Sequence, residues 1–400
     1  MTWGWPSGFW VRVTLTILPV LALLTIGCDS AAQSTPNNPE PTETPVQTPT
    51  ETPTEIPTEE PTSEPTPDDA TPAEPAFEEP IEVQVVDSDI TANVAGSGEY
   101  EPDSDTLIAY FNDGENASQN PRLYMISPDG EVTRTWEVAN RHGTILGDRR
   151  VLANGNIMFI IWDDGVYEMT PDGEIVWSYL DDEITHHAEI LPNGNVLLVG
   201  SECNCVREVD YETQEELWYW DARQSLPDYS SDEEFLGHEG FGIRSIYSHT
   251  YVEGQPWAHV NHAQVLPNDN VLVSLRNFDL VMEIERDGNV VWSFGPGIVK
   301  HQHTPRDLGD GTMLVYDNGN HRVILVDRGT QEILWEYDDL FAPIMGDVSL
   351  LEDGNYKVVD ALDDAVKVVS PDEDLLWSIE IESETEYRGI YRAHMPGLED

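Results

Sequence analysis

The chain has 400 residues, and its 76 Asp and Glu against 19 Lys and Arg give a formal net charge of −57. A charge of that size and sign repels a phosphate backbone, so nucleic acid is excluded as a partner. Three cysteines are too few for a disulfide framework, and the length exceeds that of a usual single core, which favours several domains or a repeat architecture.

The first predicted segment is an export signal over residues 1–28. Residues 13–26 form an apolar stretch that is short for a membrane span and suits the core of a signal peptide. It ends in LTIGC, which resembles the lipobox of bacterial lipoproteins, where the cysteine is acylated and becomes the mature N-terminus. We therefore expect an exported protein that is lipid-anchored to the cell membrane through Cys28; an uncleaved anchor is the alternative.

The second predicted segment, residues 29–80, is a disordered linker. It consists largely of Thr, Pro and Glu, with 13 of the chain's 28 prolines and almost no large apolar residue. Such a composition cannot bury a core, and its charge and polyproline-like stiffness predict an extended spacer between a membrane and the domain that follows.

From residue 81 to residue 400 one pattern recurs: a leucine and a turn, a short β run, a second turn, and a β run that ends in tryptophan. The spacings between successive repeat tryptophans are 41, 41, 74, 43 and 42 residues. The six tryptophans are Trp136, Trp177, Trp218, Trp292, Trp335 and Trp377. Short strands at a period near 42 predict an all-β fold, a six-bladed β-propeller, with the tryptophans packed between blades.

Two departures from the regular period are informative. The 74-residue gap equals one repeat plus an insertion at about residues 221–258, which we expect to be a lid-like loop. Residues 82–104 and 379–400 flank the repeats and are expected to add strands that close the ring.

Six of the eleven histidines break the symmetry of the repeats. They precede three successive leucine turns: His186 and His187, His259 and His262, and His301 and His303. The segment that leads into the first strand of a blade lies beside the central channel, so these histidines are expected to converge at one mouth. Period-two alternation places His301 and His303 on one side, sets His259 and His262 on opposite sides, and lets only one of His186 and His187 face the channel.

A single cation accompanies this cluster. Ten residues after the turn leucine the repeats carry Trp162, Ser201, Arg276, Asn318 and Ala361, so only the fourth repeat has arginine. An arginine beside imidazoles predicts a site for sulfate, phosphate or carboxylate. Cys203 and Cys205 are expected in a loop after a strand of the third blade rather than in a metal site, because the chain has no second cysteine pair.

Three segments together resemble the arylsulfotransferase family of six-bladed propeller enzymes. They are THHAEILPNGNVLLV, WAHVNHAQVLPNDNVLVSLRN and HQHTPRDLGDGTMLVYDNGN, in the family's order, and a later YRAH stretch extends the resemblance to about residues 105–395. The resemblance implies transfer of a sulfuryl group from an aryl sulfate to a phenol through a sulfohistidine, with no metal and no nucleotide cofactor.

By motif position the resemblance implies His303 as the nucleophile. Its implied helpers are His259, Arg276 and a histidine of the His186–His187 pair, while His262, His301 and Asn318 are the candidates for substrate binding. The family usually has Asp directly after the signature histidine, whereas Thr304 and Ala188 stand there in this chain.

Two other functions compete with a transferase. A non-catalytic propeller would use the same mouth to hold an anionic ligand or an acidic partner segment. A His-rich metal site would use His301, His303, His259 and a histidine of the third blade as imidazole ligands.

Overall fold

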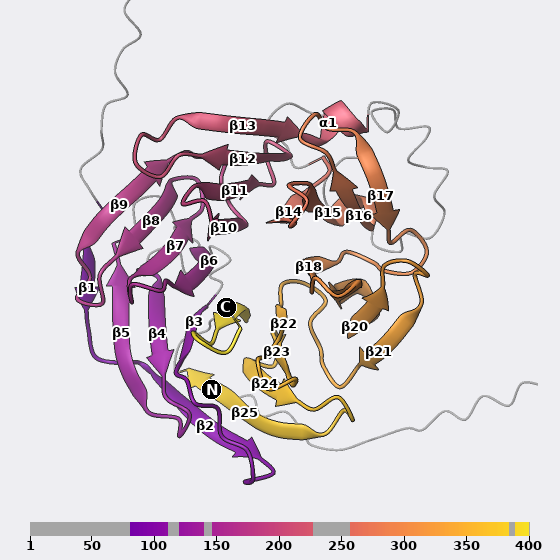
Figure 1. Ribbon diagram of the computed structural model, residues 1–400. Coiled ribbons are helices and arrows are strands. Elements are labelled where there is room, and N and C mark those ends of the chain that lie inside the picture. The colour runs from indigo at the N-terminus through magenta and orange to yellow at the C-terminus, as the bar shows by residue number, and fades with distance from the viewer. Residues whose placement is uncertain (1–80, 111–119, 140–145, 227–256, 384–388, 400) are drawn as a thin grey trace, which may run out of the picture. The chain divides into compact units, whose positions relative to one another are not determined.

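The computed structural model describes residues 81–110, 120–139, 146–226, 257–383 and 389–399 (Figure 1). These residues belong to one compact unit, 73–400. The predicted signal peptide, with Cys28, and the predicted linker lie outside the described residues. Among the residues described, no helix combines the length and the apolar character needed to cross a membrane.

Six antiparallel sheets stand around a common axis and form a six-bladed β-propeller, as the spacing of the tryptophans predicts (Figure 1). Blade 2 contains β6 (Leu146–Val151), β7 (Ile157–Ile161), β8 (Gly165–Met169) and β9 (Ile175–Leu180). Blade 3 contains β10 (His187–Ile190), β11 (Val196–Gly200), β12 (Cys205–Val209) and β13 (Glu216–Asp221). Blade 4 contains β14 (Val260–Val265), β15 (Val271–Leu275), β16 (Leu280–Ile284) and β17 (Val290–Phe294). Blade 5 contains β18 (His303–Asp307), β19 (Thr312–Asp317), β20 (Arg322–Asp327) and β21 (Ile333–Tyr337).

The two remaining blades combine strands from both ends of the chain. Blade 1 contains β26 (Ile390–His394), β3 (Thr106–Tyr110), β4 (Arg122–Ile126), β5 (Val132–Val138) and β1 (Val83–Val85), in that order. Blade 6 contains β22 (Val348–Leu350), β23 (Tyr356–Asp360), β24 (Ala365–Val369), β25 (Leu375–Ser383) and β2 (Ile90–Gly96). The expectation that the flanking residues close the ring is confirmed, since β26 pairs with β3 and β2 pairs with β25.

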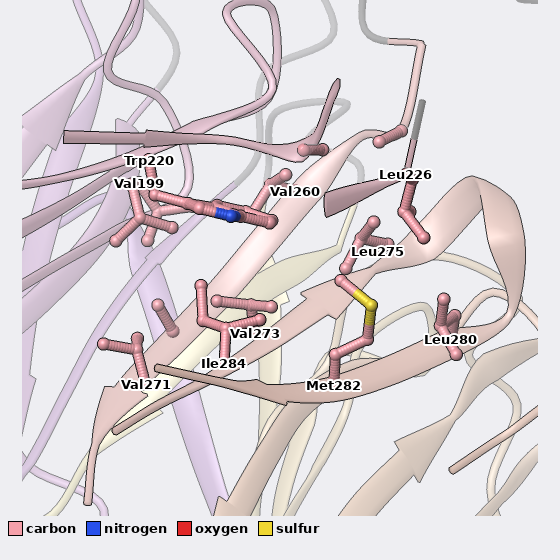
Figure 2. Packing of buried hydrophobic residues seen from close by; sticks show 14 of the residues in the cluster. Val199, Trp220, Leu226, Val260, Val271, Val273, Leu275, Leu280, Met282 and Ile284 are labelled. Atoms are coloured by element: carbon pink, nitrogen blue, oxygen red, sulfur yellow. The ribbon is translucent and has the colours of Figure 1, made fainter. Parts of the chain in front are cut away.

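Apolar side chains pack the blades against one another. Between blades 3 and 4, Trp220 and Val199 meet Val260, Val273 and Met282 in one cluster, which Figure 2 shows. Such contacts are repeated around the ring because each strand places alternate side chains on the same face of its blade.

The repeat tryptophans join adjacent blades, as predicted, by packing and by hydrogen bonds. Each stands on the fourth strand of its blade, and five of the six donate indole Nε1–H to a backbone carbonyl in a turn of the next blade. The acceptors of Trp136, Trp177, Trp218, Trp292 and Trp377 are the carbonyls of Pro171, Tyr211, Arg286, Arg328 and Pro128. Trp335 instead stacks on Tyr356 of blade 6, with 4.1 Å between the ring centroids.

Most of the predicted insertion, residues 227–256, lies outside the described residues, and with it the expectation of a lid. Its described borders are well packed. After β13 the chain forms the short helix α1 (Ala222–Ser225), which Asp221 caps by accepting a hydrogen bond from the backbone N–H of Arg223. The chain resumes at Trp257 and Ala258, both buried.

Candidate functional site

The six histidines lie where the innermost strands begin. His187 opens β10, His303 opens β18, and His259 directly precedes β14. The backbone there is irregular, because His259, His301 and Thr304 have φ of 53°, 50° and 41°, in the left-handed region that L-residues with a side chain rarely occupy. Backbone strain of this kind concentrates at functional sites.

These histidines form two groups. The first, the Arg276 group, contains Arg276, His186, His259, His301 and His303. Burial lowers the pKa of all four of these histidines, and the charge of Arg276 lowers it further. The second, the Asp148 group, contains Asp148, His187, His262 and Arg392. The rings of His187 and His262 lie in contact, tilted by 59° to each other, with 4.4 Å between their centroids.

His186 and His187 belong to different groups because successive side chains of a strand point in opposite directions. His186 reaches His259, with 3.1 Å between the two Nε2 atoms. His187 reaches Asp148 and His262. The sequence analysis let only one of His186 and His187 face the channel and set His259 and His262 on opposite sides. The structure separates the members of both pairs: His186 and His259 lie in the Arg276 group, and His187 and His262 lie in the Asp148 group.

His303 has a single well-defined tautomer. The Asn318 amide nitrogen donates to the carbonyls of Ala342 and Met345, which turns its Oδ1 toward His303. His303 Nδ1–H therefore donates to Asn318 Oδ1 at 2.6 Å, and the carbonyl of His301 lies 3.2 Å from the same nitrogen. With the proton on Nδ1, Nε2 of His303 carries the lone pair.

Burial keeps the imidazoles of the Arg276 group neutral at pH 7. Burial and then the charge of Arg276 lower the pKa of His303 to about 3 and that of His301 to about 4. Burial also holds the pKa of His186 and of His259 well below the ordinary histidine value. A neutral imidazole is the nucleophilic form, so the group combines uncharged nucleophiles with the positive charge of Arg276.

Equivalent positions of four neighbouring blades contact this group. Arg276 begins the 3-10 helix η2 (Arg276–Phe278), and its backbone N–H donates to the carbonyl of His259 at 3.1 Å. Asn318 begins η3 (Asn318–Asn320) and supports His303. The rings of Trp162 and His186 lie 4.9 Å apart, and the Ser201 hydroxyl bonds that of Thr185, which itself bonds Nδ1 of His186.

The Asp148 group contains two residues that sequence reasoning did not select. Asp148, on β6, accepts hydrogen bonds from Nδ1 of His187 at 2.7 Å and from the Arg392 guanidinium at 2.9 Å. Burial alone would raise the pKa of Asp148, but Arg392 and His187 hold it well below its usual range. Asp148 was visible in the sequence where the second repeat carries Gly147-Asp148 in place of histidines, and Arg392 belongs to the YRAH stretch.

The acidic orienter expected after each signature histidine comes from elsewhere in the chain. Asp148 of blade 2 orients His187 of blade 3, and Asn318 of blade 5 orients His303 of its own blade through a neutral amide. Both imidazoles therefore have an acceptor for Nδ1–H, although Thr304 and Ala188 stand where the family usually has Asp.

A further ionic cluster lies among the inner strands of blades 5, 6 and 1. Lys357 is fully buried and bonds Asp347 at 2.8 Å and Glu399 at 2.6 Å, and Arg306 lies 3.3 Å from Asp347. Glu399, the last described residue, thus pairs with the buried ammonium group of Lys357.

Cys203 lies in the turn that follows β11, as expected, and it forms a disulfide with Cys205, the first residue of β12. Within the described ranges, no three His, Cys, Asp or Glu side chains are grouped so as to hold a metal ion.

The sequence matches a protein-family model over about the middle half of the chain. The model is described as Arylsulfotransferase (ASST), and it matches residues 102–299. Over these residues the chain belongs to the arylsulfotransferase family. The matched segment includes His186, His187, His259, His262 and Arg276, and it ends before His301.

Solved structures resemble this arylsulfotransferase family member at low sequence identity. A protein of unknown function from Bacteroides caccae is 16% identical with a TM-score of 0.53, covering 73% of this chain and 98% of its own. The WD40 β-propeller domain of Doa1 is 12% identical (TM-score 0.45; 78% and 89% covered). An inactive virginiamycin B lyase from Staphylococcus aureus, solved with quinupristin, is 9% identical (TM-score 0.46; 75% and 98% covered). No curated protein matches the sequence.

Proposed function

We propose that the protein transfers a sulfuryl group from an aryl sulfate to a phenol through a covalent intermediate on His303. The observation that carries the proposal is the tautomer of His303. Asn318 and the carbonyl of His301 hold the proton on Nδ1, so Nε2 is a neutral nucleophile beside the charge of Arg276.

In the first step the lone pair of His303 Nε2 attacks the sulfur of the aryl sulfate. The sulfur–oxygen bond to the ring breaks, and the phenolate leaves with its electron pair. The positive charge that develops on the imidazole is stabilised through Nδ1–H by Asn318, and Arg276 stabilises the sulfuryl oxygens and the departing phenolate.

In the second step a phenol attacks the sulfur of the sulfohistidine, and the sulfur–nitrogen bond breaks. A lone pair of the His186–His259 pair accepts the phenol proton, since both imidazoles are neutral. The pair passes this proton to solvent, and the phenolate released in the first step takes a proton from solvent, so atoms and charge balance over a full turnover.

The cellular setting is proposed on the sequence alone. The lipobox at Cys28 would anchor the protein to a membrane after export, and residues 29–80 would hold the propeller away from the lipid surface. Radiolabelled fatty acid incorporated by the wild type and not by Cys28→Ala would support this; incorporation by both would refute it.

The proposed reaction is tested with a chromogenic aryl sulfate, with and without a second phenol, by following phenol release. We expect acceptor-dependent release that His303→Ala abolishes, with a sulfuryl adduct on His303 when the acceptor is omitted. His321→Ala is the matched control, because His321 follows η3 as its C-cap residue and its ring stacks on that of Phe341.

Wild-type rates in His303→Ala would overturn the assignment of the nucleophile. Binding of an aryl sulfate without release or adduct, in a folded protein, would favour the non-catalytic binding propeller.

A further inference from the structure

The disulfide turn of blade 3 holds a buried asparagine between its two cysteines. Asn204 is 1% exposed and has φ of 58°, a left-handed conformation that asparagine tolerates better than most residues. Cys203 and Cys205 on either side are bonded to each other, so the disulfide closes a very short loop around this residue.

The side chain of Asn204 accepts hydrogen bonds from the backbone of the segment that carries His259. Its Oδ1 accepts from the N–H of Ala258 at 2.6 Å and from the N–H of His259 at 3.2 Å. Its Nδ2 donates to the carbonyl of Glu202 at 3.0 Å, which fixes the orientation of the amide. The acceptor atom is therefore directed at the backbone of residues 258 and 259.

The same asparagine also bonds the chain before the insertion. The backbone carbonyl of Asn204 accepts from the N–H of Ala222 at 2.9 Å. Asn204 thus contacts the described residues on both sides of the segment 227–256, through its backbone on one side and its side chain on the other.

The opposite side of the His259 segment is fixed by blade 4. The N–H of Arg276 donates to the carbonyl of His259, and the N–H of Asn277 donates to the carbonyl of Ala258, both at 3.1 Å. His259 is consequently held in its left-handed conformation, with φ of 53°, between Asn204 on one side and η2 on the other. This conformation directs its ring to Nε2 of His186.

We propose that Asn204 is a positioning residue for His259 and that the Cys203–Cys205 disulfide keeps it in place. The inference rests on the proposed function, because His259 is taken to bind the reacting groups and to move the phenol proton. Asn204 acts through the backbone of its neighbour and need not touch substrate.

Two substitutions separate the acceptor from the backbone conformation. Asn204→Gly keeps the left-handed conformation and removes the acceptor, whereas Asn204→Asp keeps the conformation and the acceptor and loses the Nδ2 donor to Glu202. We expect Asn204→Gly to lower kcat on the order of 10²-fold, as a misplaced reacting group does, and Asn204→Asp to restore activity to near the wild-type rate.

The acceptor phenol supplies a readout that a merely structural role would not move. A misplaced His259 should slow transfer to weakly acidic phenols more than transfer to strongly acidic phenols, because only the former need a base to take their proton. Asn204→Gly should therefore reproduce the acceptor dependence of His259→Ala. An equal loss for all acceptors would overturn the proposal.

A measurement without turnover distinguishes failure of this proposal from failure of the proposed function. The imidazole NMR signal of His259, assigned by its absence in His259→Ala, should shift in Asn204→Gly and remain in place in Asn204→Asp. If the wild type shows no transfer, the proposed function fails and the NMR shift still tests the position of His259. An unchanged signal in Asn204→Gly would overturn the role of Asn204.

The disulfide is tested with the double variant Cys203→Ser, Cys205→Ser. We expect the same shift of the His259 signal and a loss of kcat smaller than that of Asn204→Gly, because the acceptor remains. Wild-type behaviour of this variant would overturn the part assigned to the disulfide.

Discussion

At His303, two acceptors on one side of the ring decide which nitrogen reacts. Asn318 Oδ1 and the carbonyl of His301 both lie within hydrogen-bond distance of Nδ1, and burial prevents the ring from taking a second proton. The turn residue Asn318 was a candidate for substrate binding on the sequence, and the structure places its amide on the candidate nucleophile and on two backbone carbonyls.

Removing that acceptor should impair the first chemical step. We expect Asn318→Ala to lower the single-turnover rate of sulfuryl uptake on the order of 10²-fold, because the ring of His303 loses its orientation. Asn318→Asp keeps an acceptor and should retain more activity. A rate for Asn318→Ala equal to that of the wild type, measured by quenched-flow with an aryl sulfate, would contradict the role of this side chain.

The rate of sulfuryl uptake should not change near pH 6.5. The lone pair of His303 is lost only on protonation, and the pKa of His303 lies at about 3. Its neighbours His301, with a pKa of about 4, and His186 and His259, with pKa values well below normal, stay neutral as well, and Arg276 stays charged. Single-turnover rates should be constant from pH 5 to pH 8. A change of rate with a midpoint near pH 6.5 would show that these histidines titrate normally.

Among the elements, the blades were predictable because their determinants are local. Turn residues, short apolar runs and a tryptophan recur within each 42-residue period, and five of the six indoles make the same bond to the next blade. The partners of the histidines were not predictable in the same way. Asp148 and Arg392 come from strands β6 and β26, which are far apart in sequence and meet only in the closed ring.

The hydrogen bond of a repeat tryptophan can be isolated by comparing two blades. Trp218→Phe removes the bond to the Arg286 carbonyl, at 2.7 Å, and keeps an aromatic ring for the Arg286 guanidinium, which lies over the indole. Trp335→Phe is the matched control, since its Nε1 has no hydrogen-bond partner within the described part of the chain. We expect Trp218→Phe to lower the free energy of unfolding by about 1 kcal/mol more than Trp335→Phe in urea titrations. Equal losses would mean that the indole bond adds nothing to the packing.

For the whole molecule, buried neutral histidines make stability depend on pH. Burial lowers the pKa of His186, His259, His262, His301 and His303 in the folded protein. The unfolded chain therefore binds protons first as the pH falls through about 6.5, and the free energy of unfolding decreases from there toward about pH 3.

Each such histidine adds a slope of at most about 1.4 kcal/mol per pH unit in that window. We expect chemical denaturation at pH 7, 6 and 5 to give steadily lower free energies of unfolding. In His262→Gln the decrease per pH unit should be smaller, by at most the contribution of one histidine. A stability that rises between pH 7 and pH 5 would show that the folded protein binds these protons more tightly than the unfolded chain does.

The ring closure by β26 also sets the order of events when the protein is made. Blade 1 lacks its innermost strand until residues 390–394 have been synthesised, and Lys357 lacks Glu399 until residue 399 has been added. A chain that stops before β26 leaves an unpaired edge on β3 and leaves Lys357 with Asp347 as its one remaining acidic partner among the described residues. Strand β26 thus makes closure of the ring a late step in synthesis, because Arg392 reaches Asp148 only when β26 has joined blade 1.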